Sequence, residues 1–239
     1  LGLNDPLVVQ YLRYVSDAVR GDLGTSIRSG QPVIDEILDY LPSTLTLTIT
    51  AVLTAAAFGI TLGVLAAISK RPGVDAGIMG FALIGISMPT FWSGILMILL
   101  FGLKLDWLPI AGDGWRALIL PTITLAAPAA AVLARMTRSS MLEVLSQDFV
   151  RTARAKGLRD RIVVIRHVLR NALVPIITII GLQFGALLGG AVIVESVFSR
   201  PGLGRYTVTA IQQRDFPQIQ GTVLFAAAST LLSAQTPVR

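Results

Sequence analysis

Several uncharged apolar stretches, each long enough to cross a bilayer, predict an all-α polytopic membrane protein. Of the 239 residues, 53% are hydrophobic and 14% are charged, whereas soluble domains carry about 25% charged residues. The mean hydropathy is +0.71. A helix needs roughly 20 apolar residues to cross the hydrocarbon core, and uncharged stretches of this order recur between short polar loops. The composition therefore excludes an ordinary soluble domain.

The charges of the loops predict how the spans are oriented. Residues 69–75 and 135–170 hold eleven Arg or Lys against four acidic residues, while 1–42 and 104–116 hold five against eight. Loops rich in Arg and Lys stay in the cytoplasm, so the first pair of segments is expected inside and the second outside. The cytoplasmic loops also account for the net charge of +6, and we expect no nucleic-acid partner.

Residues 1–42 are expected to form an external loop and a short helix that enters the membrane. The segment is polar and acidic, and its glycines divide it into short pieces. One helix is expected around residues 7–20 and another over 32–40. The G-D-L-G-T-S stretch at 21–26 is interpreted as a solvated loop to which no chemistry is assigned.

Residues 43–239 are expected to form the transmembrane domain. Its first span alternates threonines with apolar residues as a strand would, but the uncharged length favours a helix. The threonine hydroxyls can then bond to carbonyl groups of their own helix. The last span offers only 14 uncharged residues between Gly221 and Ala234, a length of about 21 Å that is shorter than the hydrocarbon core. The five expected spans are residues 43–69, 76–103, 117–138, 172–198 and 217–235.

Three residues of these spans are candidates for lining a transport pathway: Ser87, Pro89 and Gln183. A proline within a span frees a backbone carbonyl, which a membrane tolerates only against protein or a water-lined cavity. Pro89 therefore marks either a pore-lining kink in the second span or an ordinary packed kink. The sequence leaves both interpretations open.

The fourth span carries a glycine stripe and a single acidic residue. Gly181, Gly185 and Gly189 recur at four-residue spacing, which lets another backbone approach closely, either within the subunit or across a dimer. Glu195 lies near the far end of the span. An ionisable residue at that depth is a functional candidate, although its side chain could also simply reach the membrane interface.

A polar cytoplasmic segment, residues 139–171, carries helical features of its own. Asp148 is expected to cap a short helix, because its carboxylate can accept the free N–H groups of a first turn. Gly157 lies where a glycine would end that helix in a left-handed turn. This pattern predicts a docking element on the cytoplasmic side. Three apolar side chains are expected to share one side of the helix: Phe149, Val150 and Ala153.

Two strings in this segment resemble the coupling loop (the EAA loop) of ABC-importer membrane subunits, in the form found in peptide and nickel permeases. They read D-F-V-R-T-A-R-A-K-G-L at 148–158 and R-H-V-L-R-N-A-L-V-P at 166–175. Arg151 and Thr152 stand where the general loop has glutamate and alanine, as in the peptide and nickel branch. The resemblance implies that the first string contacts a partner ATPase. Its residues are Asp148, Phe149, Val150, Arg151, Thr152, Ala153, Arg154, Ala155, Lys156, Gly157 and Leu158.

A third string, E-S-V-F-S-R-P-G-L-G-R at 195–205, resembles the outer end of the fifth helix in the same family. With the acidic N-terminal loop, it is more similar to the B-type than to the C-type subunit of the heterodimeric pairs. Family members begin with a membrane helix ahead of a stretch like 1–26, so we expect a first helix to precede this chain and six spans in the intact protein. The implied outer gate, or surface toward the binding protein, is formed by Glu195, Phe198, Pro201, Gly202, Gly204 and Arg205.

The resemblance implies a type I ABC-importer fold and ATP-driven alternating access in the bacterial cytoplasmic membrane. The implied partners are a C-type permease subunit, two ABC ATPases and an extracytoplasmic binding protein. The sequence has no G-x-x-x-x-G-K-[ST] phosphate-binding loop, so ATP and Mg²⁺ are expected on the ATPases, with no cofactor on this chain. Peptides are the expected cargo, and nickel or another small solute is the alternative.

Two other classes of protein fit the sequence less well. An intramembrane hydrolase or a metal enzyme would need paired functional groups, but His167 is the only histidine, no carboxylate adjoins it, and there is no cysteine. We therefore expect no catalytic or metal site. A secondary transporter driven by an ion gradient would need acidic residues in mid-membrane, and Glu195 near the end of a span is the only one in the apolar stretches.

Overall fold

The computed structural model of the chain describes residues 6–69, 71–112 and 114–234. The first five residues of the expected external segment and residue 235 of the expected last span lie outside the described residues. The described chain is helical, apart from loops and one isolated bridge between Thr25 and Pro32. The elements are α1 (Leu7–Val19), α2 (Val33–Ile68), α3 (Pro72–Ser87), α4 (Thr90–Met97), η1 (Ile98–Lys104), α5 (Trp115–Leu145), α6 (Asp148–Ala155), α7 (Asp160–Ile162), η2 (Val163–Leu169), α8 (Arg170–Val197), α9 (Leu203–Gln213) and α10 (Phe216–Ala234), where η1 and η2 are π-helical.

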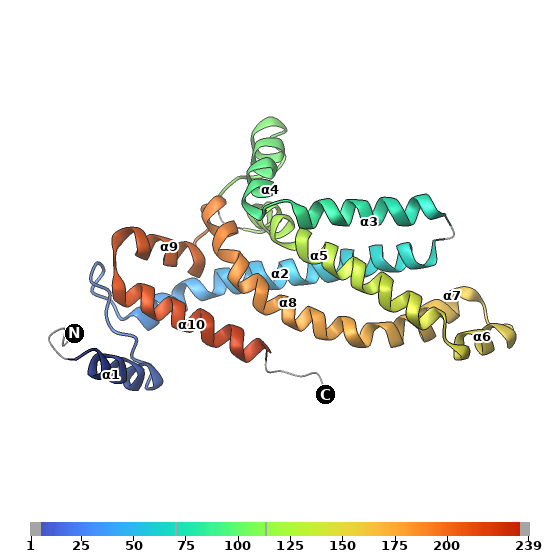
Figure 1. The fold of residues 1–239 in the computed structure, drawn as a ribbon. Helices are drawn as coiled ribbons and strands as arrows, with labels where there is room; N and C mark the ends of the chain where they lie inside the picture. Colours follow the sequence, from blue (N-terminus) through green and yellow to red (C-terminus); the bar gives the residue numbers. More distant parts are fainter. Residues whose placement is uncertain (1–5, 70, 113, 235–239) are drawn as a thin grey trace.

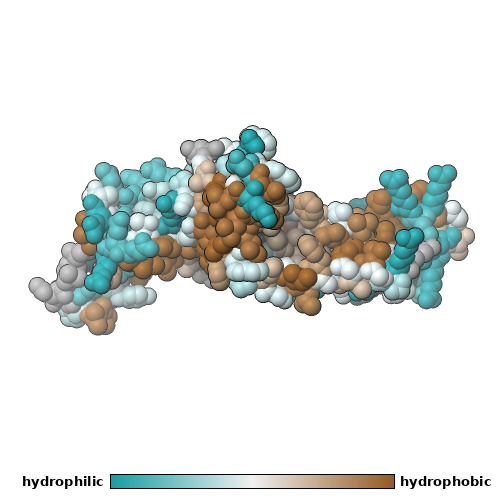
Figure 2. Space-filling model, turned by 90° about the horizontal axis from the view of Figure 1, so that it is seen from above, coloured by the Kyte–Doolittle hydropathy of each residue, from teal (hydrophilic) through white to brown (hydrophobic). Residues whose placement is uncertain are grey.

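Helices α2, α5 and α8 run along the long axis of an elongated bundle (Figure 1) and enclose its core. Leu47 of α2, Leu133 of α5 and Ile176 of α8 are fully or almost fully buried there. Figure 2 shows hydrophobic residues gathered over the middle of the molecule and hydrophilic residues at both ends. Helices α6 and α7 lie at one end, and α1 and α9 lie at the other (Figure 1). The two ends are therefore separated by the length of a membrane-spanning bundle.

The expected helix over 32–40 and the expected first span are one continuous helix, α2. It passes through Pro42, whose missing N–H removes one helical hydrogen bond. The Thr46 hydroxyl donates to the Pro42 carbonyl at 2.7 Å, and the Thr50 hydroxyl donates to the Thr46 carbonyl at 2.8 Å. The prediction that threonines of this span bond to their own helix is confirmed for these two residues.

The second span was expected to be one helix over residues 76–103 that Pro89 kinks. The structure instead has two helical segments that meet at 103°. Helix α3 ends at Ser87 and α4 begins at Thr90. Met88 has an extended backbone, because the ring of a following proline disfavours the helical conformation. Helix α4 consequently points away from the bundle (Figure 1).

Among the described residues, long apolar helices account for three spans by length and composition, or up to four when the bent pair counts as one. The three are α2, α5 and the continuous helix Asp160–Val197. The 19-residue α10 does not belong to this set. This agrees with its short apolar stretch of 14 uncharged residues between Gly221 and Ala234.

The close packing of α2 against α5 involves two glycines that the sequence analysis did not identify. A Cβ atom at Gly59 would lie 2.6 Å from Leu133 Cβ, and one at Gly63 would lie 2.5 Å from Thr137 Cβ. Both glycines therefore allow α2 and α5 to touch, and their G-x-x-x-G spacing was the signal that could have revealed them.

Two glycines of the α8 stripe, unlike Gly59 and Gly63, do not face a neighbouring helix closely. Gly185 is buried, but a Cβ atom at Gly181 or Gly189 would meet no other described atom within 4 Å. Close approach within the subunit is therefore wrong for these two positions, and approach across a dimer stays a prediction.

Candidate functional site

The expected docking helix is present as α6, which begins directly at Asp148. Gln147 precedes it with an extended backbone, and no side chain caps the helix. The prediction that Asp148 is the capping residue is therefore wrong. Its carboxylate belongs to the first turn, where negative charge still favours the helix dipole, and lies 3.7 Å from the Arg151 guanidinium.

Gly157 ends this helix as predicted. Its φ angle is +80°, a left-handed conformation that glycine adopts without a steric penalty. The Gly157 N–H donates to the Arg154 carbonyl at 2.9 Å, and the Arg154 guanidinium reaches across the corner to the Asp160 carboxylate at 3.1 Å. The chain then turns into α7 and η2.

One residue anchors α6 to the bundle. Val150 is fully buried among Met141 and Val144 of α5 and Val163 and Val168 of η2. This apolar cluster joins α6 to the helix that continues into α8. The outward positions of the expected ATPase-contacting string are exposed: Asp148, Phe149, Arg151, Thr152, Arg154, Ala155, Lys156, Gly157 and Leu158.

The expectation that three apolar residues share the inner side of α6 holds for two of them. Ala153 is partly buried and packs against the cluster around Val150. Phe149, however, is exposed, because it lies one residue, about 100° of rotation, from Val150. The exposed surface of α6 therefore carries an aromatic side chain together with the charges.

At the opposite end of the bundle, Glu195 is fully buried. The Thr44 hydroxyl donates to Glu195 Oε1 at 2.6 Å, and the backbone N–H groups of Gly204 and Arg205 donate to Oε2 at 2.8 and 3.3 Å. The Leu203 N–H in turn donates to the Thr44 hydroxyl at 2.8 Å. The alternative in which Glu195 simply reaches the membrane interface is wrong, since its carboxylate binds the first turn of α9.

The glycines of the same string are required by this contact. A Cβ atom at Gly202 would lie 2.2 Å from Glu195 Oε1, and one at Gly204 would lie 2.3 Å from Val192 Cα. Both distances are far below van der Waals contact. The structure therefore brings Glu195, Gly202 and Gly204 together.

The remaining residues of the expected outer gate differ in their exposure to solvent. Phe198 is buried and lies near Gly94 of α4. Pro201 and Arg205 are exposed. The Arg205 guanidinium donates to the Ser199 carbonyl, which closes the loop between α8 and α9.

A second polar network holds the other end of α9. The Ser26 hydroxyl donates to the buried Asp215 carboxylate at 2.8 Å, and the Gln218 amide donates to Ser26 at 3.0 Å and to the Glu36 carboxylate at 2.8 Å. The Tyr206 hydroxyl also donates to Glu36, and burial together with that carboxylate raises the pKa of Tyr206. The interpretation of 21–26 as a purely solvated loop is therefore wrong.

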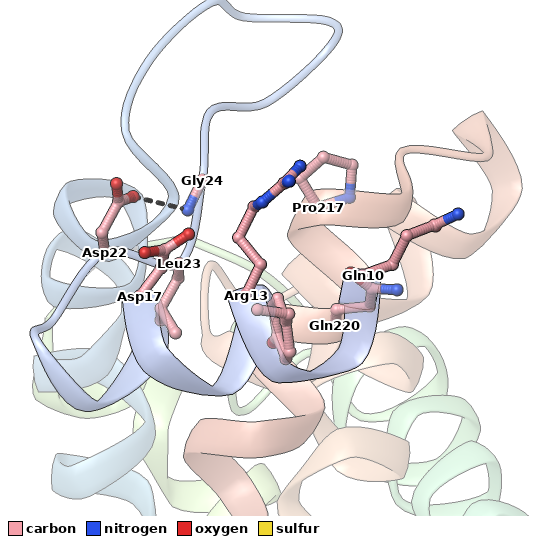
Figure 3. Close-up of a pocket in the computed structure, with 9 residues that line it drawn as sticks. Gln10, Arg13, Asp17, Asp22, Leu23, Gly24, Pro217 and Gln220 are labelled. Carbon is pink, nitrogen blue, oxygen red and sulfur yellow. Dashed lines mark hydrogen bonds between the residues drawn. The ribbon is translucent and has the colours of Figure 1, made fainter. Parts of the chain in front are cut away.

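No local pattern could have revealed that network, because Ser26 and Asp215 are 189 positions apart. An adjacent pocket of about 280 Å³ lies between α1, the chain around Leu23 and the start of α10. Figure 3 shows Arg13, Asp17 and Asp22 among the residues that line it. None of the sequence-predicted site residues lines it.

The expected pore-lining residues fall in two places. Ser87 and Pro89 are exposed on either side of the bend between α3 and α4, whereas Gln183 is half-buried on α8. Among the described residues, no hydrogen bond joins Gln183 to the other two. Their part in a transport pathway stays a prediction.

Comparison with known proteins agrees with this architecture. Residues 59–234 match the family described as "Binding-protein-dependent transport system inner membrane component". The glutathione transport system permease protein GsiC of Escherichia coli K12 is 48% identical over 233 residues, which cover 97% of this chain and 76% of that protein. GsiC of Salmonella paratyphi A is 47% identical over the same shares of the two chains.

Solved structures share the fold at low sequence identity. A MetNI methionine ABC transporter chain has a TM-score of 0.68 at 20% identity, covering 83% of this chain and 91% of that chain. An amino acid ABC transporter chain has a TM-score of 0.66 at 19% identity, covering 84% and 90%. The type I ABC-importer permease fold is therefore confirmed. This chain is an inner-membrane permease that belongs to the family of binding-protein-dependent transport system inner membrane components.

Proposed function

We propose that this chain is the permease subunit of an ATP-driven importer of short peptides. The observation that carries the proposal is the 48% identity, over 97% of the chain, to permeases named for glutathione transport. Glutathione is a tripeptide, so these relatives support the peptide class over nickel or another small solute. The permease itself contributes shape and gating and performs no covalent chemistry.

The geometry of α6 supports coupling to a separate ATPase. A transmission element needs one face that a partner can grip and another that is firmly joined to the moving helices. The exposed charges and Phe149 supply the first face, and buried Val150 supplies the second. A displacement of α6 would therefore act on η2 and, through it, on α8. Closure of two ATPases on ATP would drive this displacement.

The outer corner around Glu195 and α9 would form the outer gate beneath an extracytoplasmic binding protein. Its buried hydrogen bonds give it a defined shape, and its exposed Pro201 and Arg205 face the solvent. A C-type permease subunit would complete the pathway. The open positions Gly181 and Gly189 of α8 leave room for close packing of such a partner.

Reconstitution would test this function. The complex of both permease subunits, both ATPases and the binding protein is placed in proteoliposomes, and uptake of glutathione, dipeptides, longer peptides and Ni²⁺ is measured. We expect ATP-dependent uptake of peptides and no uptake with an ATPase variant that cannot hydrolyse ATP. Uptake of Ni²⁺ alone would contradict peptide transport. Peptide uptake driven by an ion gradient without ATP would instead establish a secondary transporter.

A further inference from the structure

Helix α9 begins without a capping side chain of its own. Its N-cap position is Gly202, and the first N–H groups of a helix have no partners within the helix. A Ser, Thr, Asp or Asn is preferred at this position, because its side chain accepts one of these N–H groups. Here the N–H groups of residues 203, 204 and 205 all donate to side chains from other helices.

Two helices supply the missing cap. Thr44 belongs to α2 and accepts from Leu203, while Glu195 belongs to α8 and accepts from Gly204 and Arg205. The Thr44 hydroxyl also donates to Glu195 Oε1, so the two caps are joined to each other. The carboxylate occupies the space that a side chain at Gly202 would fill. This explains why a glycine precedes α9.

The arrangement is costly to separate. Glu195 and Thr44 are 0% and 3% exposed, and a buried carboxylate that loses its donors has no water to replace them. The helix dipole adds to the attraction, because the negative charge lies at the N-terminus of α9. If α9 moved away from α8, the carboxylate and three N–H groups would lose their partners together.

We propose that Glu195 and Thr44 are positioning residues that carry α9 as one rigid unit with α8 and α2, so that motion from the cytoplasmic end reaches the outer gate. Helix α8 is continuous with η2, which packs against α6, and its 28 residues extend about 42 Å. Motion of α6 would therefore be transmitted to α9 through α8 and through the hydrogen bonds of Thr44 and Glu195 to the first turn of α9. We call these contacts the outer joint. The inference rests on the proposed transport function.

Substitutions at Thr44 test the joint without changing a charge. Thr44→Val keeps the side-chain shape but removes the bonds to Glu195 and Leu203, whereas Thr44→Ser keeps the hydroxyl and is the matched control. In the reconstituted complex, we expect Thr44→Val to lower peptide transported per ATP hydrolysed by about fivefold to tenfold, the factor for a lost buried hydrogen bond. Thr44→Ser should keep the ratio of peptide transported to ATP hydrolysed at the value of the unmodified complex. A normal ratio in Thr44→Val would overturn the proposal.

A distance measurement separates positioning from simple loss of stability. This sequence has no cysteine, so spin labels at Ile193→Cys on α8 and Thr209→Cys on α9 report this joint when the partner subunits are also made free of cysteine; both native residues are exposed. With native Thr44, we expect one label distance in the nucleotide-free and ATP-bound complex. With Thr44→Val, the distribution should broaden or shift between the states.

Two outcomes would contradict the rigid joint: a label distance that changes between states with native Thr44, or an unchanged, narrow distribution in Thr44→Val. Either result is independent of the cargo. Absence of peptide uptake by the unmodified complex would instead contradict the proposed function, and the label distances would still decide whether α9 follows α8.

Discussion

Helix α6 at one end of the bundle and helix α9 at the other are both short, and both are joined to the ends of long spanning helices, but they are held in opposite ways. The Asp148 and Arg151 side chains of α6 are 96% and 77% exposed, and their charges are 3.7 Å apart. Glu195, which holds α9, is fully buried and accepts a hydrogen bond of 2.6 Å. An exposed ion pair stabilises little, whereas a broken buried polar contact costs much more.

The difference matches the two mechanical tasks proposed for these helices. A surface that meets a separate protein must leave its polar groups unburied until that protein arrives, and α6 relies on one buried apolar residue, Val150, for its attachment. A joint inside the subunit has no later partner, so its polar groups are satisfied within the chain. Substitutions at α9 should therefore disturb folding, and substitutions on the outer face of α6 should disturb coupling.

The largest effect is expected at the outer joint. Gly204→Ala would place a Cβ atom 2.3 Å from the backbone of α8, so α9 must shift, and we expect a loss of about 3 kcal/mol in stability. Gly80→Ala on α3 is the matched control, because its Cβ atom would meet no other described atom within 4 Å. Yield and thermal melting of the purified complex in detergent measure both. Equal melting of the two variants would show that α9 adapts freely.

A pair of tryptophan substitutions separates the two faces of α6. Ala153→Trp would intrude on the apolar cluster around Val150, where overpacking costs about 1–3 kcal/mol. Ala155 is exposed, so Ala155→Trp should leave the melting temperature unchanged and reduce ATPase co-purification and transport. Measuring melting and co-purification for both checks this. Unchanged ATPase binding by Ala155→Trp would mean that this side of α6 meets no ATPase.

A smaller effect is expected at the corner after α6. Gly157→Val forces a β-branched side chain into a left-handed conformation, at a cost of about 1 kcal/mol or more. We expect transport to fall while the permease reaches the membrane at normal levels. Gly157→Asn, which tolerates this conformation, should transport nearly normally. Equal activities of the two variants would rule out corner geometry as the cause.

The smallest effect is expected at the exposed pair between Arg154 and Asp160. Their side chains are 48% and 71% exposed, so Asp160→Asn should change stability by less than about 1 kcal/mol, and this change should vanish at high salt. Melting curves at low and high salt measure it. A large loss of stability that does not depend on salt would show that this pair holds the fold together, as the buried hydrogen bonds of Thr44 and Glu195 do.

Local structure followed closely from the sequence. The three long spanning helices were visible because helix formation in a membrane depends on uninterrupted apolar length, and the turn at Gly157 was visible because few other residues adopt its backbone conformation. The identity of α6 as a short helix rested on residues within a few positions of one another. Even here, Asp148 was misplaced by one position, because helix ends depend on backbone angles that many sequences permit.

The sequence by itself therefore determined the all-α class, the sorting of charge among the loops and the position of the short helix α6 along the chain. Only the tertiary structure decided that Glu195 turns inward, since its partner Thr44 is 151 positions away, and that Ser26 meets Asp215. It also decided the 103° bend at Pro89, because a proline predicts a break but not its angle. Contacts between distant residues depend on how whole helices pack, and packing responds to the shapes of all the neighbours at once.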